Sequence, residues 1–224
     1  MLVAWLRFPA LIATLATYYV FKSLAVVVND QRPISTPEIQ ELYSITSAVE
    51  LPLIGQYLPD IPLGVFTFLI PTVVLVWLLL QRSTYGRRLF AIGTNDTAAE
   101  WSGVRVEWAR LRAYAIAGAI AGAVAVYTTA QFASARPDAG TSGNGMALPA
   151  ITIAVLGGVA ITGGIGRVSG VLLAALLITW LDAGMLLLFE GNQGTQFQLL
   201  ALGSVLIFAA LLNSYTIRRY GGTR

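Results

Sequence analysis

Six long apolar runs dominate this chain of 224 residues. An α-helix needs about 20 apolar residues to cross the hydrocarbon core of a bilayer, and most of the runs approach or exceed that length. None shows the two-residue alternation of a membrane β-barrel, and open sheet edges are not tolerated in lipid. We therefore expect an all-α, polytopic integral membrane protein, a single domain over residues 1–224 with about six transmembrane helices, one of them short. The runs are Leu2–Val28, Ile61–Leu80, Leu111–Gln131, Leu148–Thr162, Val168–Phe189 and Phe197–Leu212.

Composition supports this class and excludes several kinds of chemistry. The chain is 56% hydrophobic and only 11% charged, too few charges to cover a soluble domain of this length. It has neither cysteine nor histidine, which excludes disulfides, Ser-His-Asp and Cys-His catalysis, and histidine metal sites. We expect no catalytic residues, no metal, no cofactor and no nucleic-acid partner.

The basic residues orient the helices. If the N-terminus is cytoplasmic, eleven of the fourteen Lys and Arg residues fall on the cytoplasmic side, and only Arg32 and Arg136 fall outside. The remaining one, Lys22, lies inside the first apolar run. This asymmetry follows the positive-inside rule, so both termini and the loop over residues 82–110 are predicted to be cytoplasmic.

The cytoplasmic loop carries signals for a short helix. Thr94 or Asn95 can cap its N-terminus, and residues 97–100 read as a capping box. Asp96 and Glu100 suit the positive end of the helix dipole, and Gly103 is expected to end the helix with a positive φ. The small residues Ala98, Ala99, Ser102 and Gly103 are expected on the accessible side, where another protein could approach closely. The alternative is a connector that places Trp101 and Trp108 at the membrane interface.

The same residues resemble a known family. The chain is similar to permeases of ABC importers of the ribose, galactose and xylose type, within the branched-chain-amino-acid-type permease superfamily. The resemblance extends over essentially the whole chain, from Leu15, Thr17, Lys22 and Leu24 to the glycines near residue 170. The matching positions are Gly86-Arg87, residues 90–93, Asn95, Ala98-Ala99, Ser102-Gly103-Val104, Val106, residues 134–137, Gly140-Thr141, Ala150-Ile151, Gly157-Gly158, Gly163-Gly164, Gly166 and Gly170.

The resemblance implies partners and a role for the loop. In such permeases the cytoplasmic loop carries the coupling helix that docks on a separate ATPase subunit. We therefore expect an ATPase, a second permease subunit, an extracytoplasmic substrate-binding protein and the bacterial plasma (inner) membrane as partners or surroundings. The ATPase-contacting residues would be Gly93, Asn95, Asp96, Ala98, Ala99, Glu100, Ser102 and Gly103.

The chain departs from the family pattern in three places. Helices that normally precede the first run are missing, so the chain is expected to be a fragment, a product of a misplaced start, or half of a split permease. Residues 145–149 replace acids that are usual before the fourth run, and Asp182 replaces a polar amide. The last two differences leave the substrate open.

Glycines are concentrated in two regions. Residues 163–170 lack the G-K-[ST] ending of a phosphate-binding loop, so we expect a tight turn with close backbone contact instead. Gly118 and Gly122 form a GxxxG pattern, for which we expect packing within the subunit rather than a dimer seam.

Polar residues within apolar runs are the candidates for a solute path. They are Thr14, Thr17, Tyr18, Lys22, Gln131, Thr152, Asp182 and Gln196, with Gln198 beside the last. Each is also compatible with a packing role. Lys22 and Asp182 are expected at similar depths, roughly 10 Å below the outer boundary at a rise of about 1.5 Å per residue, and form a possible ion pair.

The sequence therefore predicts a permease subunit that imports a monosaccharide or similar small polar solute. The alternatives are a branched-chain amino-acid importer, a membrane-embedded enzyme and a non-transporting scaffold. The stretch over residues 29–60, with five acids, is expected to be an ordered external loop that either contacts a binding protein or is simply solvated.

Overall fold

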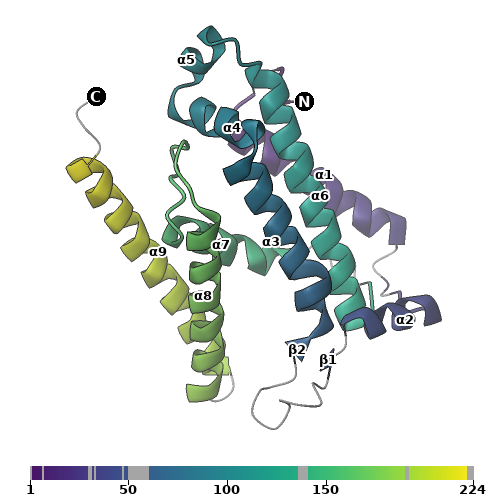
Figure 1. Cartoon of the computed structure of the whole chain (residues 1–224). Coiled ribbons are helices and arrows are strands. Elements are labelled where there is room, and N and C mark those ends of the chain that lie inside the picture. The colour runs from purple at the N-terminus through teal and green to yellow at the C-terminus, as the bar shows by residue number, and fades with distance from the viewer. Residues whose placement is uncertain are drawn as a thin grey trace. The chain divides into compact units, whose positions relative to one another are not determined.

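The computed structural model describes residues 2–6, 8–29, 32, 34–46, 48–49, 61–135, 141–189 and 192–220. Apart from a hairpin of two short strands, its regular elements are helices (Figure 1). The chain divides into two compact units, one of residues 1–85 and 105–142, the other of residues 86–104 and 143–224. The second unit therefore combines the insert between two apolar runs with the C-terminal third of the chain.

The first unit begins with α1 (Ala10–Asn29). We expected this helix to start at Leu2, which is wrong, because residues 2–5 form turns and the helix follows Pro9. Proline has no amide hydrogen and disfavours helical backbone in the residue before it. The N-terminal turn is nevertheless fixed, since the rings of Trp5 and Trp108 meet edge to face with centroids 5.8 Å apart.

The next elements of this unit are α2 (Pro37–Thr46) and the antiparallel pair β1 (Ala48–Val49) and β2 (Ile61–Pro62). Helix α2 packs against α6 (Val106–Phe132), as Figure 1 shows. Nearby, Ile34 and Ala135 exchange two backbone hydrogen bonds of 2.9 Å, and Ser35 Oγ donates to Ala133 O at 3.0 Å. Part of the predicted external loop is thus ordered on the end of α6, while residues 50–60 lie outside the described residues.

The second apolar run forms one continuous helical rod from η1 (Val65–Leu69) through α3 (Ile70–Trp77) to η2 (Leu78–Arg82), in which η1 and η2 are π-helical. Ile70 N–H donates to Val65 O, the wider spacing of a π-helix, immediately before Pro71. Proline cannot donate to the helix ladder, and a widened turn is one way to accommodate this loss. Phe68 of this rod stacks on Tyr127 of α6 at 5.3 Å.

The second unit contains most of α4 (Thr84–Thr94), α5 (Asp96–Trp101), most of α7 (Thr141–Leu156), α8 (Val168–Leu188) and α9 (Asn192–Tyr220). Helices α8 and α9 lie side by side (Figure 1), and the stacked rings of Phe189 and Phe197 close the turn between them at 4.3 Å. All six apolar runs are therefore helical over most of their length.

Three of these helices are long and apolar enough to span a membrane within the part of the chain that the structure describes. They are Val65–Arg82, Val106–Phe132 and Val168–Leu188. The other three apolar stretches, Ile12–Val28, Met146–Leu156 and Gln196–Leu211, are shorter. Large apolar side chains such as Val28, Trp180 and Leu187 are more than three-quarters exposed, as expected for surfaces that face lipid rather than water.

Candidate functional site

The segment of residues 86–104, which we call the insert, contains the short helix α5 that its sequence predicts. Asn95 is the N-cap, and its side-chain oxygen accepts a hydrogen bond of 3.0 Å from Ala98 N–H. Gly103 has a φ of +81°, and its N–H donates to Glu100 O at 2.9 Å. Of the two predicted N-caps, Thr94 and Asn95, the structure has Asn95, and the predicted left-handed glycine is confirmed.

The predicted capping box over residues 97–100 is wrong. Because the cap falls on Asn95, Thr97 is already the second residue of the helix, and the third is Ala98. Glu100 is therefore two residues beyond the position from which a capping-box side chain reaches back to the cap. It remains an exposed charge on α5.

One side of α5 is accessible. Thr97, Ala98, Glu100, Trp101 and Ser102 are exposed, and Trp101 is 87% exposed. We expected Ala99 on this side as well, which is wrong, since Ala99 is buried with 5% exposure. Residues three apart share a face of a helix, and Ala99 lies on the face of the half-buried Asp96. The accessible surface, which we call the α5 face, is therefore Ala98, Trp101, Ser102 and Gly103, with Glu100 beside them.

A tyrosine links the start of α4 to α6. Tyr85, at the start of α4, donates its hydroxyl to Ala109 O in α6 at 3.0 Å. Burial raises the pKa of Tyr85, and the positive charge of Arg112 partly opposes this shift. The phenol therefore stays protonated at neutral pH and remains a donor. The ring of Trp108 packs on Trp5, whereas Trp101 is exposed.

The candidate solute-path residues fall in both units. On α1, Thr14, Tyr18 and Lys22 are spaced four residues apart and share one face, and Lys22 Nζ lies 5.9 Å from the centre of the Tyr18 ring. Thr17 is on the same helix and donates to Ala13 O at 2.9 Å. Gln131 is exposed near the end of α6. The structure thus brings the α1 residues together.

The remaining candidates belong to the second unit. Thr152 of α7 is completely buried, and its hydroxyl donates to Leu148 O at 2.9 Å, which satisfies it locally. Gln196 is exposed on α9. Asp182 of α8 is half-buried, and its Oδ1 atom is fully buried without a hydrogen-bond partner among the described residues. The expected pairing of Asp182 with Lys22 stays a prediction.

The glycine regions differ from each other in packing. The turn at residues 157–167 between α7 and α8 contains Gly158, Gly163 and Gly164 with φ of +82°, +90° and +79°, so the predicted tight turn is confirmed. A Cβ on Gly118 or Gly122 would meet nothing within 4 Å in the unit that holds them, so the expectation that this pair packs within the subunit stays a prediction. What sequence analysis missed is that Gly93 meets Gly163 and Gly164. No spacing rule signals such a contact across about 70 intervening residues.

Apolar helices of spanning length, joined by a capped amphipathic insert, define a polytopic membrane protein. Residues 1–212 match the family model described as "Branched-chain amino acid transport system / permease component". The chain therefore belongs to this family of transporter permeases, which are not enzymes, and is a multi-pass protein of the bacterial inner membrane. No solved structure matches the chain significantly.

Curated relatives include proteins that import sugars. The ribose import permease of Bacillus subtilis is 35% identical over 203 residues, which are 90% of this chain and 58% of the relative. The D-allose transport system permease of Escherichia coli is 31% identical over 212 residues, 95% of this chain and 60% of the relative. An autoinducer 2 import system permease of Yersinia enterocolitica is 35% identical over 167 residues, 74% of this chain and 48% of the relative. The chain thus spans less than two thirds of the length of these relatives.

Proposed function

We propose that the chain is a membrane-spanning permease subunit of an ABC importer that moves a monosaccharide or similar small polar solute into the cell. A separate ATPase subunit drives it through α5, a second permease subunit completes the path, and an extracytoplasmic binding protein delivers the solute. The family match supports this role, as do relatives named for ribose, D-allose and autoinducer 2 import.

The observation that carries the proposal is the α5 face. A short helix with its ends fixed by Asn95 and Gly103 exposes small side chains at Ala98 and Ser102, next to the exposed Trp101. Small residues allow a partner's backbone to come close, and tryptophan is the residue type most enriched at the energetic centres of protein interfaces. A connector that only anchors the chain in lipid has no need for this combination.

The proposed topology has six transmembrane helices with both termini and α5 in the cytoplasm. It rests on the positive-inside distribution of the arginines and on helices over each of the six apolar runs. The three shorter apolar helices would cross with the help of flanking residues or in contact with neighbouring helices. The family name also keeps a branched-chain amino acid as the second candidate solute.

The docking proposal is tested with Ala98→Arg and the matched control Ala98→Ser. Each variant is expressed with its natural ATPase, and radiolabelled ribose uptake, membrane abundance and ATPase co-purification are measured. Arginine should block approach to the α5 face and abolish both uptake and co-purification at normal abundance, whereas serine should preserve them. If Ala98→Arg takes up ribose and retains the ATPase like the parent chain, α5 is not the docking helix.

The solute path is tested through its two intramembrane charges. A buried carboxylate oxygen without a partner is costly, so Asp182 is expected to face a partner or solute in the assembled importer. Uptake and abundance should fall in Lys22→Met and in Asp182→Leu and should partly recover in the double variant if the two groups form a pair. Additive defects would show that they act separately.

A further inference from the structure

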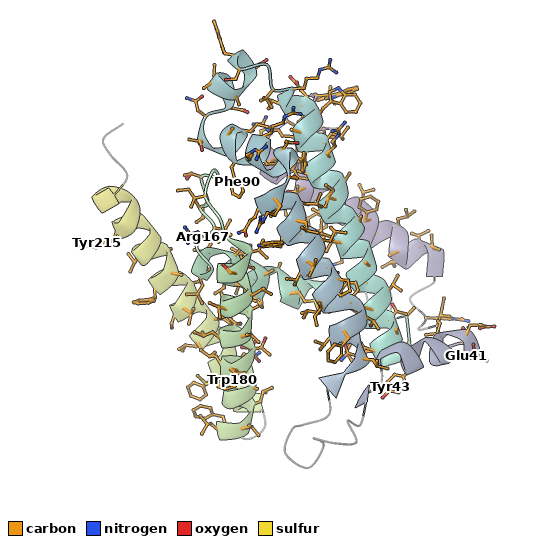
Figure 2. The ribbon with its side chains drawn as sticks, in the orientation of Figure 1. Glu41, Tyr43, Phe90, Arg167, Trp180 and Tyr215 are labelled. Carbon is orange, nitrogen blue, oxygen red and sulfur yellow. The ribbon has the colours of Figure 1, made fainter. Side chains whose placement is uncertain are left out.

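The last turn of α4 touches the turn between α7 and α8 through the backbone of Gly93 and through Thr94, whose side-chain oxygen lies beside Gly164. A Cβ on Gly93 would overlap Gly164 N, and a Cβ on Gly163 would lie 3.1 Å from Gly93 Cα and 3.2 Å from Gly93 O. A Cβ on Gly164 would lie 2.6 Å from Thr94 Oγ1. All four residues belong to the second unit. Figure 2 labels Phe90 on α4 and Arg167 at the start of α8, which mark the two elements that meet here.

The α7–α8 side of this contact is held by its own hydrogen bonds. Ala160 N–H donates to Ile165 O and Gly163 N–H donates to Ala160 O, both at 3.0 Å. At the base of the turn, a Cβ on Gly157 would lie 2.7 Å from Val171 N and Cα, so the residue that follows α7 lies in close backbone contact with α8. The turn is therefore hydrogen-bonded within itself, and its first residue packs on α8.

The other side of the contact is fixed to α5. Only Asn95 separates α4 from α5, and its N–H donates to Ala91 O at 3.1 Å while its O accepts from Ala99 N–H at 3.1 Å. Thr94 Oγ1 donates to Phe90 O at 2.9 Å. Backbone hydrogen bonds therefore continue from α4 through Asn95 into α5. On its other side, α5 joins α6 through residues 102–105, which are not helical. Val104 N–H donates to Ala99 O at 3.1 Å, and Arg105 makes no side-chain cap bond.

We propose that Gly93 and the turn at Gly163–Gly164 form a fixed joint through which displacement of α5 moves α7 and α8. Gly93 is then a positioning residue for coupling: it touches neither solute nor nucleotide, but holds the docking helix against the helices that it moves. Contact of the Gly93 backbone with the backbone of Gly163 and Gly164 suits this role, because no flexible side chain lies between these three residues to absorb the displacement. The proposal of this joint rests on the proposed importer function, and it specifies that α7 and α8 are the helices that move with α5.

The sequence connection offers a competing route from α5 into α6. Three variants separate the two routes. Gly93→Ala forces the joint apart, Gly118→Ala adds the same methyl group to a helical glycine with open space around it, and Arg105→Gly loosens the link to α6. Radiolabelled ribose uptake should fall about tenfold or more in Gly93→Ala, with ATPase co-purification retained, because the methyl group overpacks the joint. Gly118→Ala and Arg105→Gly should keep parental uptake.

The opposite pattern would overturn the proposal, whether Gly93→Ala transports normally or Arg105→Gly abolishes uptake while retaining the ATPase. If the parent chain itself neither takes up ribose nor retains an ATPase, the importer function fails and a second measurement decides on the joint. The chain has no cysteine, so spin labels can be placed at Ala98→Cys on α5 and at the exposed Ser169→Cys on α8. In lipid nanodiscs the label distance should be narrowly distributed, unchanged in Gly118→Ala and broadened in Gly93→Ala. A distribution that Gly93→Ala leaves unchanged contradicts a joint at this position.

Discussion

At Gly93 a methyl group would overlap the backbone of Gly164, whereas at Gly118 and Gly122 a methyl group would meet no atom within 4 Å. Gly93 lies in α4 and the other two lie in α6, so both regions are helical, but only the second is marked in the sequence by a regular glycine spacing. In the first region glycine is required by contact between two elements. In the second it leaves a smooth, exposed face on α6.

This difference shows that glycines allow close packing, but that close packing occurs only where a neighbouring element lies against them. GxxxG patterns allow helices to approach in membranes, but the pattern itself does not supply the neighbour. The turn glycines have a second reason to be glycine, since Gly163 and Gly164 have positive φ values that L-residues rarely adopt. These two reasons can be separated by substitution.

The largest effect is expected where Gly157, the residue that follows α7, meets α8. Gly157→Ala would place a methyl carbon 2.7 Å from the backbone of Val171, which cannot move aside without shifting the helix. Overpacking of this kind costs about 1–3 kcal/mol, so the folded fraction and the membrane abundance should fall. Gly184→Ala, on α8 with nothing within 4 Å, is the matched control and should be neutral. Equal thermal stability of the two variants in detergent would contradict the close contact of Gly157 with α8.

A somewhat smaller effect separates backbone strain from contact. Gly158 and Gly164 both have φ near +80°, but a Cβ on Gly158 meets nothing within 4 Å whereas one on Gly164 meets Thr94. Gly158→Ala should therefore lower the free energy of unfolding by about 1–2 kcal/mol through backbone strain alone. Gly164→Ala should lower it further, because the added methyl group also meets Thr94. Adding Thr94→Ala should restore part of the Gly164→Ala defect, as measured by thermal unfolding. An identical loss for both glycines would show that strain alone matters.

A smaller and local effect is expected at the cap of α5. Asn95→Ala removes the acceptor for Ala98 N–H and should cost about 1 kcal/mol, confined to this helix. Amide exchange at Ala98 should become faster, while exchange in α8 should not change. Asn95→Asp retains an acceptor and should behave like the parent chain. Unchanged exchange at Ala98 in Asn95→Ala would mean that the cap does not hold α5.

The smallest effect, of opposite sign, is expected on α6. Alanine is favoured over glycine in a helix interior by about 0.5–1 kcal/mol, so Gly118→Ala and Gly122→Ala should be neutral or slightly stabilising for this chain. Thermal unfolding of the purified chain in detergent measures this. A clear loss of stability would show that the glycine face of α6 is covered in the folded protein.

Much of the fold follows from the sequence, because it depends on local rules. Apolar runs of spanning length predict the helices, and the pattern Asn95 to Gly103 predicts α5 with both ends correct. The errors at this level are also local: Pro9 delays the start of α1, and the cap at Asn95 displaces the capping box.

The candidate site is less accessible to sequence reasoning, because its contacts are not local. Ala98 and Ala99 are identical in type and adjacent, yet only Ala98 is exposed, which depends on how α5 is oriented in its unit. The meeting of Gly93 with Gly163 and Gly164 likewise depends on tertiary packing. Sequence patterns predict that each of these glycines allows close approach but give no information about which glycine approaches which.

The most direct test of the account is whether the insert and the C-terminal helices form one cooperative unit, which amide hydrogen exchange followed by mass spectrometry can measure. Locally cooperative segments open together. In Gly93→Ala, exchange should accelerate together in residues 86–104 and in the turn at 157–167, while α6 stays as protected as in the parent chain and in Gly118→Ala. Acceleration of residues 86–104 together with α6, with the 157–167 turn unchanged, would contradict the account and place the insert with its neighbours in sequence.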